Sequence, residues 1–176
     1  MKATVFVGAS VDGFIARADG ALDFLPDGDV EEHGYEALMA SVDALVIGRK
    51  TYETVLGLGG WAYGAKPVFV LSSRPLVASP PRAVVERMEG DPADIVSRLE
   101  ARGIQHAYVD GAHTIQGFLR AGLIDRLVIT RVPVLIGAGI SLFGLLPHDI
   151  RLTHVATRSY PSGLVQSEYA VAGSRA

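Results

Sequence analysis

The sequence predicts a layered α/β fold, in which helices flank a central sheet and an antiparallel hairpin ends the chain. Segments with strand-like and with helical apolar patterns alternate along most of the 176 residues. The last two strand-like segments instead flank a turn, Tyr160-Pro-Ser-Gly163. No repeat or linker interrupts the pattern, so we expect a single domain over residues 1–176.

The first half of the chain contributes three predicted strands and two predicted helices. A strand is expected at residues 3–7, a helix at 31–39 and a buried strand at 43–47. A short helix at 51–56 follows at once, and a glycine-rich connection then leads to a strand at 67–71.

The next helix has the clearest start signal in the chain. Asp91 suits the N-cap, Pro92 the first helical position and Asp94 the first turn, while Gly103 is placed to stop the helix. A sharply bounded helix is therefore expected between Asp91 and Gly103.

The second half continues with a strand at residues 106–109 and an amphipathic helix that ends before Gly122. A long β-branched strand follows at 126–136, and the strands 150–158 and 164–171 form the terminal hairpin.

Composition narrows the classes of function. The net charge of -3 comes from 16 basic and 19 acidic residues that are scattered, which argues against a nucleic-acid partner and favours a small molecule. Cysteine is absent, and the five histidines lack metal-ligand spacing, so we predict no metal. No apolar run reaches the length of a membrane span, and we expect a cytoplasmic protein.

The most informative motif joins the strand at 43–47 to the following helix. A helix start offers unpaired backbone N–H groups and the positive end of the dipole, and basic and hydroxyl side chains here add further donors. The candidate phosphate-binding residues are Gly48, Arg49, Lys50 and Thr51.

Two further loops follow predicted strands in the same way. Ligands of open α/β sheets lie beyond the carboxyl ends of the strands, so three such loops could meet one dinucleotide; the alternative is that they only make tight turns. The residues added to the site are Leu71, Ser72, Ser73, Arg74, Asp110, Gly111, Ala112, His113 and Thr114. Two hydroxyls and a guanidinium at 72–74 favour NADPH over NADH.

If the NADPH site serves a reductase that adds hydride to a C=N or C=O group, the reaction also needs a proton source. Acidic residues near the predicted site could provide it. The candidates are Asp12, Asp27, Asp29, Glu31, Glu32 and Glu36. We favour Glu32 as the catalytic acid, with Asp12 as the second catalytic candidate; the alternative is that these are solvated surface charges.

Taken in order, several motifs resemble the dihydrofolate-reductase-like superfamily, in the branch that includes the reductase domain of bacterial riboflavin-biosynthesis deaminase-reductases. The motifs are Ser10-Val-Asp-Gly-Phe-Ile-Ala16, Gly48-Arg-Lys-Thr-Tyr-Glu53, Leu71-Ser-Ser-Arg-Pro75, Val109-Asp-Gly-Ala-His-Thr-Ile115, Gly122-Leu-Ile-Asp-Arg-Leu127 and Val134-Leu-Ile-Gly-Ala-Gly139. The resemblance implies a three-layer fold with a mostly parallel central sheet, across whose strand ends NADPH lies.

The resemblance also implies residue roles. The loop at 48–51 would take the pyrophosphate and the 2′-phosphate, the loop at 72–74 the adenosine, and the loop at 111–114 the pyrophosphate. The segment 10–23 would form a mobile lid over nicotinamide and substrate. Ala9, Ile15 and Ala16 would edge the nicotinamide, and Thr130 would face the substrate ring.

The function implied is an NADPH-dependent reduction of a pyrimidine- or pterin-like heterocycle. It is most like the reduction of 5-amino-6-(5-phosphoribosylamino)uracil in riboflavin biosynthesis. Two alternatives stay open: a divergent dihydrofolate reductase and a non-catalytic module that binds NADPH. The apolar segment 132–136 or the terminal hairpin could pair two subunits, so a homodimer is possible.

Overall fold

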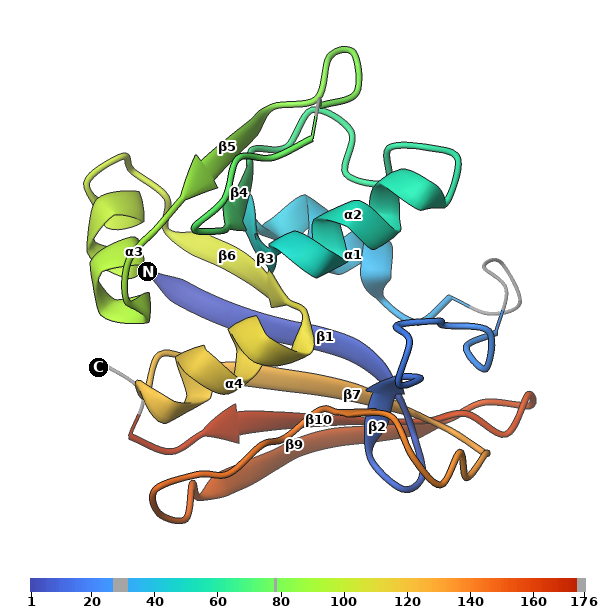
Figure 1. Cartoon of the computed structure of the whole chain (residues 1–176). Coiled ribbons are helices and arrows are strands. Elements are labelled where there is room, and N and C mark those ends of the chain that lie inside the picture. Colours follow the sequence, from blue (N-terminus) through green and yellow to red (C-terminus); the bar gives the residue numbers. More distant parts are fainter. Residues whose placement is uncertain (27–31, 78, 174–176) are drawn as a thin grey trace.

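The computed structural model describes residues 1–26, 32–77 and 79–173. Eight strands in these parts of the chain form one sheet: β1 (Lys2–Ser10), β3 (Ala44–Gly48), β4 (Val68–Leu71), β5 (Val85–Met88), β6 (His106–Asp110), β7 (Arg126–Val132), β9 (Leu152–Ser159) and β10 (Val165–Val171). Their order across the sheet is β5-β4-β3-β6-β1-β7-β10-β9 (Figure 1).

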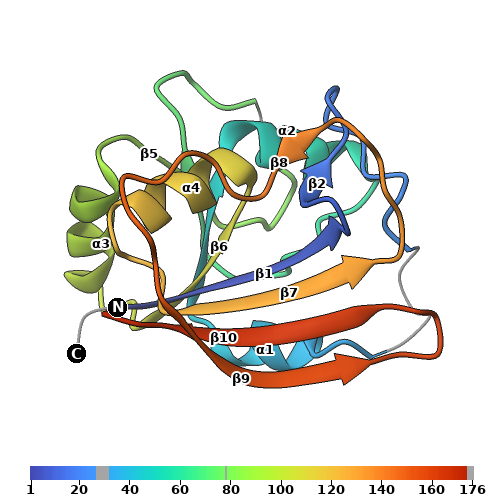
Figure 2. The same ribbon diagram turned by 90° about the horizontal axis from the view of Figure 1, so that it is seen from below.

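Strand direction divides the sheet into two parts. From β5 to β7, each strand runs parallel to its neighbours, whereas β10 pairs antiparallel with both β7 and β9. The strands β9 and β10 form the terminal hairpin, which lies along one side of the molecule in Figure 2. The predicted fold class, a mostly parallel α/β sheet that ends in an antiparallel hairpin, is confirmed.

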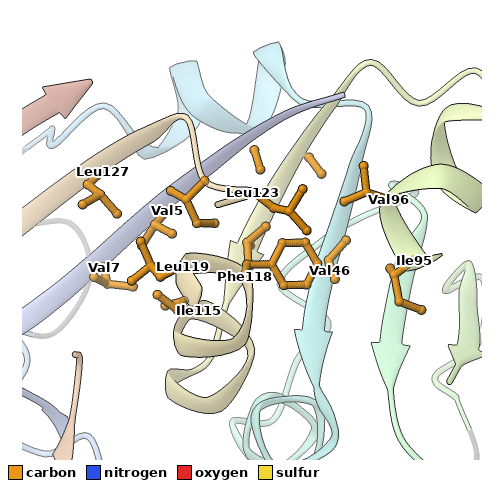
Figure 3. Packing of buried hydrophobic residues seen from close by; sticks show 14 of the residues in the cluster. Val5, Val7, Val46, Ile95, Val96, Ile115, Phe118, Leu119, Leu123 and Leu127 are labelled. Atoms are coloured by element: carbon orange, nitrogen blue, oxygen red, sulfur yellow. The ribbon is translucent and has the colours of Figure 1, made fainter. Parts of the chain in front are cut away.

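Four helices cover the two faces of the sheet in the described residues. The helices α3 (Pro92–Glu100) and α4 (Ala112–Arg120) pack with the larger apolar cluster, and α1 (Tyr35–Ser41) and α2 (Arg49–Gly57) with the smaller one. Figure 3 shows Ile115, Phe118 and Leu119 of α4 directed at the sheet beside Val5 and Val46. Ile115 and Phe118 are fully buried, and burying such a side chain contributes about 1.5–3 kcal/mol.

Several predicted bounds differ from the structure. The first helix was expected at 31–39, but α1 begins at Tyr35, because Gly34 has a φ of 86° and breaks the helical path; residue 31 lies outside the described residues. The long strand was expected to reach 136, but β7 ends at Val132, directly before Pro133, which has no N–H to donate to a ladder. The predicted helix start is confirmed at Pro92, although the Asp91 side chain makes no cap hydrogen bond.

Sequence patterns missed three short strands. The edge strand β5 was not predicted, because it is only four residues long and partly charged. The other two, β2 (Phe14–Ala16) and β8 (Ile140–Ser141), form a separate two-stranded antiparallel sheet. This small sheet ties the segment 10–23 to the loop that follows β7. No helix in the described residues has the length and apolar character needed to cross a membrane.

Candidate functional site

The carboxyl ends of the parallel strands open onto a cavity of about 980 Å³, which we call the strand-end cavity. The predicted cofactor residues that line it are Ile15, Ala16, Gly48, Arg49, Lys50, Thr51, Leu71, Asp110, Gly111, Ala112, His113 and Thr114. The loops after β3 and β6 therefore meet at one cavity, whereas the loop after β4 reaches it only through Leu71.

Two helix starts face each other at this cavity, since α2 and α4 leave the neighbouring strands β3 and β6 (Figure 1). Gly48 precedes α2 and Gly111 precedes α4, and neither position supplies a side-chain cap hydrogen bond. The first N–H groups of a helix have no partner within the helix, and they carry the positive end of its dipole. Two such ends at one cavity wall suit a ligand with more than one phosphate group.

The two glycines are packed reciprocally against threonines of the opposite helix. A Cβ at Gly48 would lie 3.0 Å from Thr114 Oγ1, and a Cβ at Gly111 would overlap Thr51 Oγ1. Gly111 also has a φ of 91°, which side chains rarely allow. Both glycines thus permit a close approach that brings two hydroxyls to the cavity wall. We call Gly48, Thr51, Gly111 and Thr114 the Gly-Thr cradle.

Basic side chains stand around the cradle. Lys50 and His113 are exposed and line the cavity. Arg49 also lines it, but its guanidinium Nη1 donates to Glu53 Oε1 at 2.9 Å, an ion pair one helical turn apart. Lys50 therefore offers a freer positive charge to an incoming phosphate than Arg49 does.

The loop 72–74 lies outside the wall of the strand-end cavity and bonds to itself. Ser72 Oγ donates to the Arg74 carbonyl oxygen at 2.7 Å and accepts from the Arg74 N–H at 3.0 Å. Arg87 Nη1 donates to the Ser72 carbonyl oxygen at 2.9 Å and so fixes the loop to β5. Ser73 and the Arg74 side chain are exposed beside Leu71. Their contact with adenosine stays a prediction.

The end of β1 presents a different residue to the cavity than expected. Ala9 is fully buried in the core, while Gly8 lines the cavity. A Cβ at Gly8 would lie 2.8 Å from Leu25 Cδ2, so Leu25 packs directly over this glycine. Sequence analysis missed Gly8 and Leu25; a glycine within an apolar strand was the available signal for close approach.

Asp12 anchors the segment 10–23 at its base. Its carboxylate accepts the N–H of Gly137 at 2.8 Å and that of Ile136 at 3.3 Å. The pKa of Asp12 is lowered mainly by a hydrogen bond from the Ser10 side chain, and the two backbone N–H groups lower it further. The residue is exposed and does not line the cavity, so the structure places it as an anchor between two loops.

Two other predicted residues also lie outside the cavity wall. Glu32 is exposed, and its Oε1 accepts the Gly34 N–H at 2.5 Å. Thr130 is buried on β7, where its Oγ1 accepts from Gln166 Nε2 at 3.0 Å. Of the other acidic candidates, Glu36 is exposed in the first turn of α1, whereas Asp27, Asp29 and Glu31 lie outside the described residues.

The acidic group with the most unusual environment is Asp110, at the end of β6. It lines the cavity and is half-buried there, and the desolvation of its carboxyl group raises its pKa. Oδ1 accepts the Gly111 N–H at 2.7 Å, and this bond and the Tyr108 hydroxyl oppose the shift. The pKa values of Tyr35, Tyr63 and Tyr108 are also raised, mainly by burial of these side chains and in second place by the charge of Asp110. A carboxyl group in such a place can hold a proton and release it into the cavity.

The described residues contain no group of three or more potential metal ligands, and the absence of a metal from the reaction stays an expectation.

Comparison with known proteins gives one family. Residues 1–166 match the model of the RibD C-terminal domain. The uncharacterized protein YwjB of Bacillus subtilis is 30% identical over 161 residues, which are 90% of this chain and 92% of YwjB. A protein from Shewanella sp. PV-4, assigned by name to riboflavin biosynthesis, has a crystal structure with a TM-score of 0.87 and 38% identity over 97% of this chain and 99% of that one.

More distant structures share the fold. The deaminase/5-amino-6-(5-phosphoribosylamino)uracil reductase of Thermotoga maritima gives a TM-score of 0.68 at 14% identity and covers 97% of this chain, which spans 56% of that protein. Dihydrofolate reductase from Enterococcus faecalis, complexed with NADP(H), gives a TM-score of 0.67 at 16% identity over 97% of this chain and 96% of its own. The predicted resemblance to this superfamily and branch is confirmed.

Proposed function

Because the chain belongs to the family of RibD C-terminal domains, we propose that it is an NADPH-dependent reductase of a pyrimidine- or pterin-like heterocycle. The observation that carries this proposal is one cavity that combines the Gly-Thr cradle with a half-buried carboxyl group of raised pKa. The first feature fits a dinucleotide, and the second fits a reduction that consumes a proton. When bound, NADPH supplies the hydride.

The residues of the Gly-Thr cradle would hold the cofactor pyrophosphate. They fit this group because Gly48 and Gly111 leave the room that a Cβ would fill, next to two helix starts. Lys50, with Arg49 beside it, would balance the negative charge. The exposed Arg74 would discriminate NADPH from NADH at the adenosine end.

In the same cavity, the chain would also position the acceptor and supply the proton. Leu25, which packs over Gly8 at the end of β1, and Leu22 from the described part of the following loop would exclude water from the acceptor. Desolvation raises the pKa of Asp110, and its protonated form would give the proton to the acceptor as hydride arrives on a neighbouring atom. Glu32 and Asp12 remain candidates for the acid, but neither lines the cavity.

We propose 5-amino-6-(5-phosphoribosylamino)uracil as the first acceptor to test. The name of the Thermotoga maritima relative supports this choice, and so does the name of the Shewanella protein. The second candidate function is a divergent dihydrofolate reductase, which the fold shared with the Enterococcus enzyme supports. The two differ in whether NADPH oxidation requires the uracil derivative or dihydrofolate.

The test compares NADPH oxidation by wild type and by Asp110→Asn, with the loss of NADPH absorbance as the readout. Asparagine keeps an oxygen for the Gly111 N–H but carries no acidic proton. We expect the variant to bind NADPH normally and to lose about a hundredfold or more in turnover, the usual contribution of a general acid. Asp94→Asn, which changes an exposed carboxylate in the first turn of α3, is the matched control.

The pH profile adds a second readout. The protonated form of Asp110 is the active one, so wild-type turnover should fall as the pH rises through its raised pKa, and Asp110→Asn should lack that limb. Normal turnover in Asp110→Asn, with an unchanged profile, would remove Asp110 from the mechanism. NADPH binding with no turnover on any heterocycle would favour the third alternative, a non-catalytic NADPH-binding module.

Cytoplasmic location and a homodimer are also part of the proposal. The hairpin supports the dimer because β9 is an edge strand whose residues are nearly all exposed, including Leu152 and Val155. Light scattering on the purified protein would measure the mass directly.

A further inference from the structure

A second cavity of about 270 Å³ lies between α1 and the part of the sheet formed by β7, β10 and β9. We call it the lateral cavity. Small residues line it on the side of α1: Gly34 at the N-cap, and Ala37 and Ser41 within the helix, three and four residues apart on one helical face. The Gly-Thr cradle and Asp110 both lie outside its wall.

Positive charge exceeds negative charge in its wall. Arg126 Nε donates to Glu168 Oε1 at 2.7 Å, so that glutamate is already paired. Arg158 also lines the cavity, is exposed, and has no ion pair or hydrogen bond to a side chain in the described parts of the chain. Arg158 lies opposite Gln166, while Glu168 lies opposite Ala156, one step further along the same face. The cavity wall therefore holds one unpaired guanidinium, that of Arg158, beside the ion pair of Arg126 and Glu168.

Polar atoms without a partner lie at the same place. His33 lines the cavity, and among the described residues its Nδ1 and the Tyr160 hydroxyl are buried with no hydrogen-bond partner. The two rings stand edge to face with centroids 4.8 Å apart. Gln166 Nε2 fixes this corner by donating to the His33 carbonyl oxygen at 2.9 Å and to Thr130 Oγ1. Buried polar groups normally find a partner, so this corner has hydrogen-bonding capacity to spare.

Phe6 lies at the boundary between the lateral cavity and the strand-end cavity, because it lines both. On the same face of β1, Gly8 follows two residues later, about 7 Å along the strand. A substituent of an acceptor bound in the strand-end cavity would have to pass Phe6 to reach the lateral cavity.

We propose that the lateral cavity is a subsite for an oxyanion, a carboxylate or a phosphate group, on a substituent of the acceptor. Arg158 supplies the unpaired charge, and Arg126 adds its remaining donors. This inference rests on the proposed function, since it extends the same substrate site. It assigns to Arg158 a role in specificity, with no part in hydride or proton transfer.

The first test uses inorganic phosphate as the probe and the unfolding midpoint as the readout. Phosphate is titrated into wild type, Arg158→Gln and Arg120→Gln, in each case after saturation with NADPH so that the Gly-Thr cradle is filled. Arg120 is the matched control, an exposed arginine in the last turn of α4 on the other face of the sheet. We expect phosphate to raise the midpoint of wild type and Arg120→Gln and to have little effect on Arg158→Gln.

Equal phosphate responses in the three proteins would overturn the subsite. A change in the oligomeric state of Arg158→Gln, with no change in its phosphate response, would also overturn it, because the occupant of the cavity would then be a second copy of the chain. Failure of the proposed function is read separately, as the absence of any NADPH response. If NADPH does not bind, the phosphate titration of the three proteins still tests Arg158.

The second test separates a free anion from an acceptor substituent. Pairs of acceptors with and without a carboxylate or phosphate substituent are compared in steady-state kinetics. Arg158→Gln should raise KM about tenfold for the charged member, the usual effect of losing a charge-assisted hydrogen bond, and leave kcat and the neutral member unchanged. Equal KM values for wild type and variant on the charged acceptor would show that the subsite does not serve the reaction.

Discussion

The Gly-Thr cradle makes a quantitative prediction for Gly111→Ala. The alanine Cβ would overlap Thr51 Oγ1, and it would lie 3.4 Å from Thr51 Cβ, an ordinary contact. Alanine would also have to adopt the φ of 91°. A backbone conformation of this kind costs about 1–3 kcal/mol, and overpacking costs about 1–3 kcal/mol more. We expect a destabilisation of about 3 kcal/mol, which for this chain length lowers the unfolding midpoint by about 6–12 °C.

A double-mutant cycle separates the two causes. Thr51→Ala removes Oγ1 and so relieves the overlap, but it leaves the backbone strain at position 111. The double variant should therefore be more stable than the sum of the single variants predicts, with a coupling of about 1–3 kcal/mol. Denaturant unfolding of wild type, both single variants and the double variant measures this coupling. Additive free energies would show that position 111 does not press on Thr51 and would refute the geometry of the cradle.

Three further predictions follow from the charges. Desolvation raises the pKa of Asp110, so its contribution to stability is lost as the pH rises through that pKa. Asp110→Asn should therefore raise the unfolding midpoint at neutral pH, and an unchanged or lower midpoint would contradict the raised pKa. Burial lowers the pKa of His106, whose ring nitrogens bond to Thr4 and Ser41, so stability should fall as the pH drops below the ordinary value of 6.5. His106→Gln should flatten that acid limb, and a wild-type slope in the variant would locate the sensitivity elsewhere. Arg74→Glu should weaken NADPH binding more than NADH binding; an unchanged preference, measured by titration of both, would exclude Arg74 from reading the 2′-phosphate.

Sequence patterns predicted the fold and twelve of the 28 residues in the cavity wall for a physical reason. Strand-to-helix junctions that begin with glycine leave a local signature, and the loops at 48–51 and 110–114 both line the strand-end cavity. The loop at 72–74 carries a similar signature but bonds to itself, because a serine hydroxyl can serve its own backbone as well as a ligand.

What sequence could not provide was burial and distant contact. Asp110 was predicted as a cofactor-binding residue, but nothing in its neighbours along the chain indicated that desolvation would raise the pKa of its carboxyl group. Leu25 packs over Gly8 from a loop seventeen positions away, and Arg158 joins Phe6 at the lateral cavity across the sheet. Such contacts depend on the topology of the whole sheet, which no local pattern encodes.

The most direct test of the account is a thermal-shift titration of the purified protein with NADPH and with NADH. At about a hundred times the dissociation constant, binding adds about 2.7 kcal/mol, which raises the unfolding midpoint by roughly 5–10 °C for a chain of this size. The account predicts such a rise with NADPH and a clearly smaller one with NADH at the same concentration. No rise with either nucleotide would contradict the claim that the strand-end cavity is a dinucleotide site.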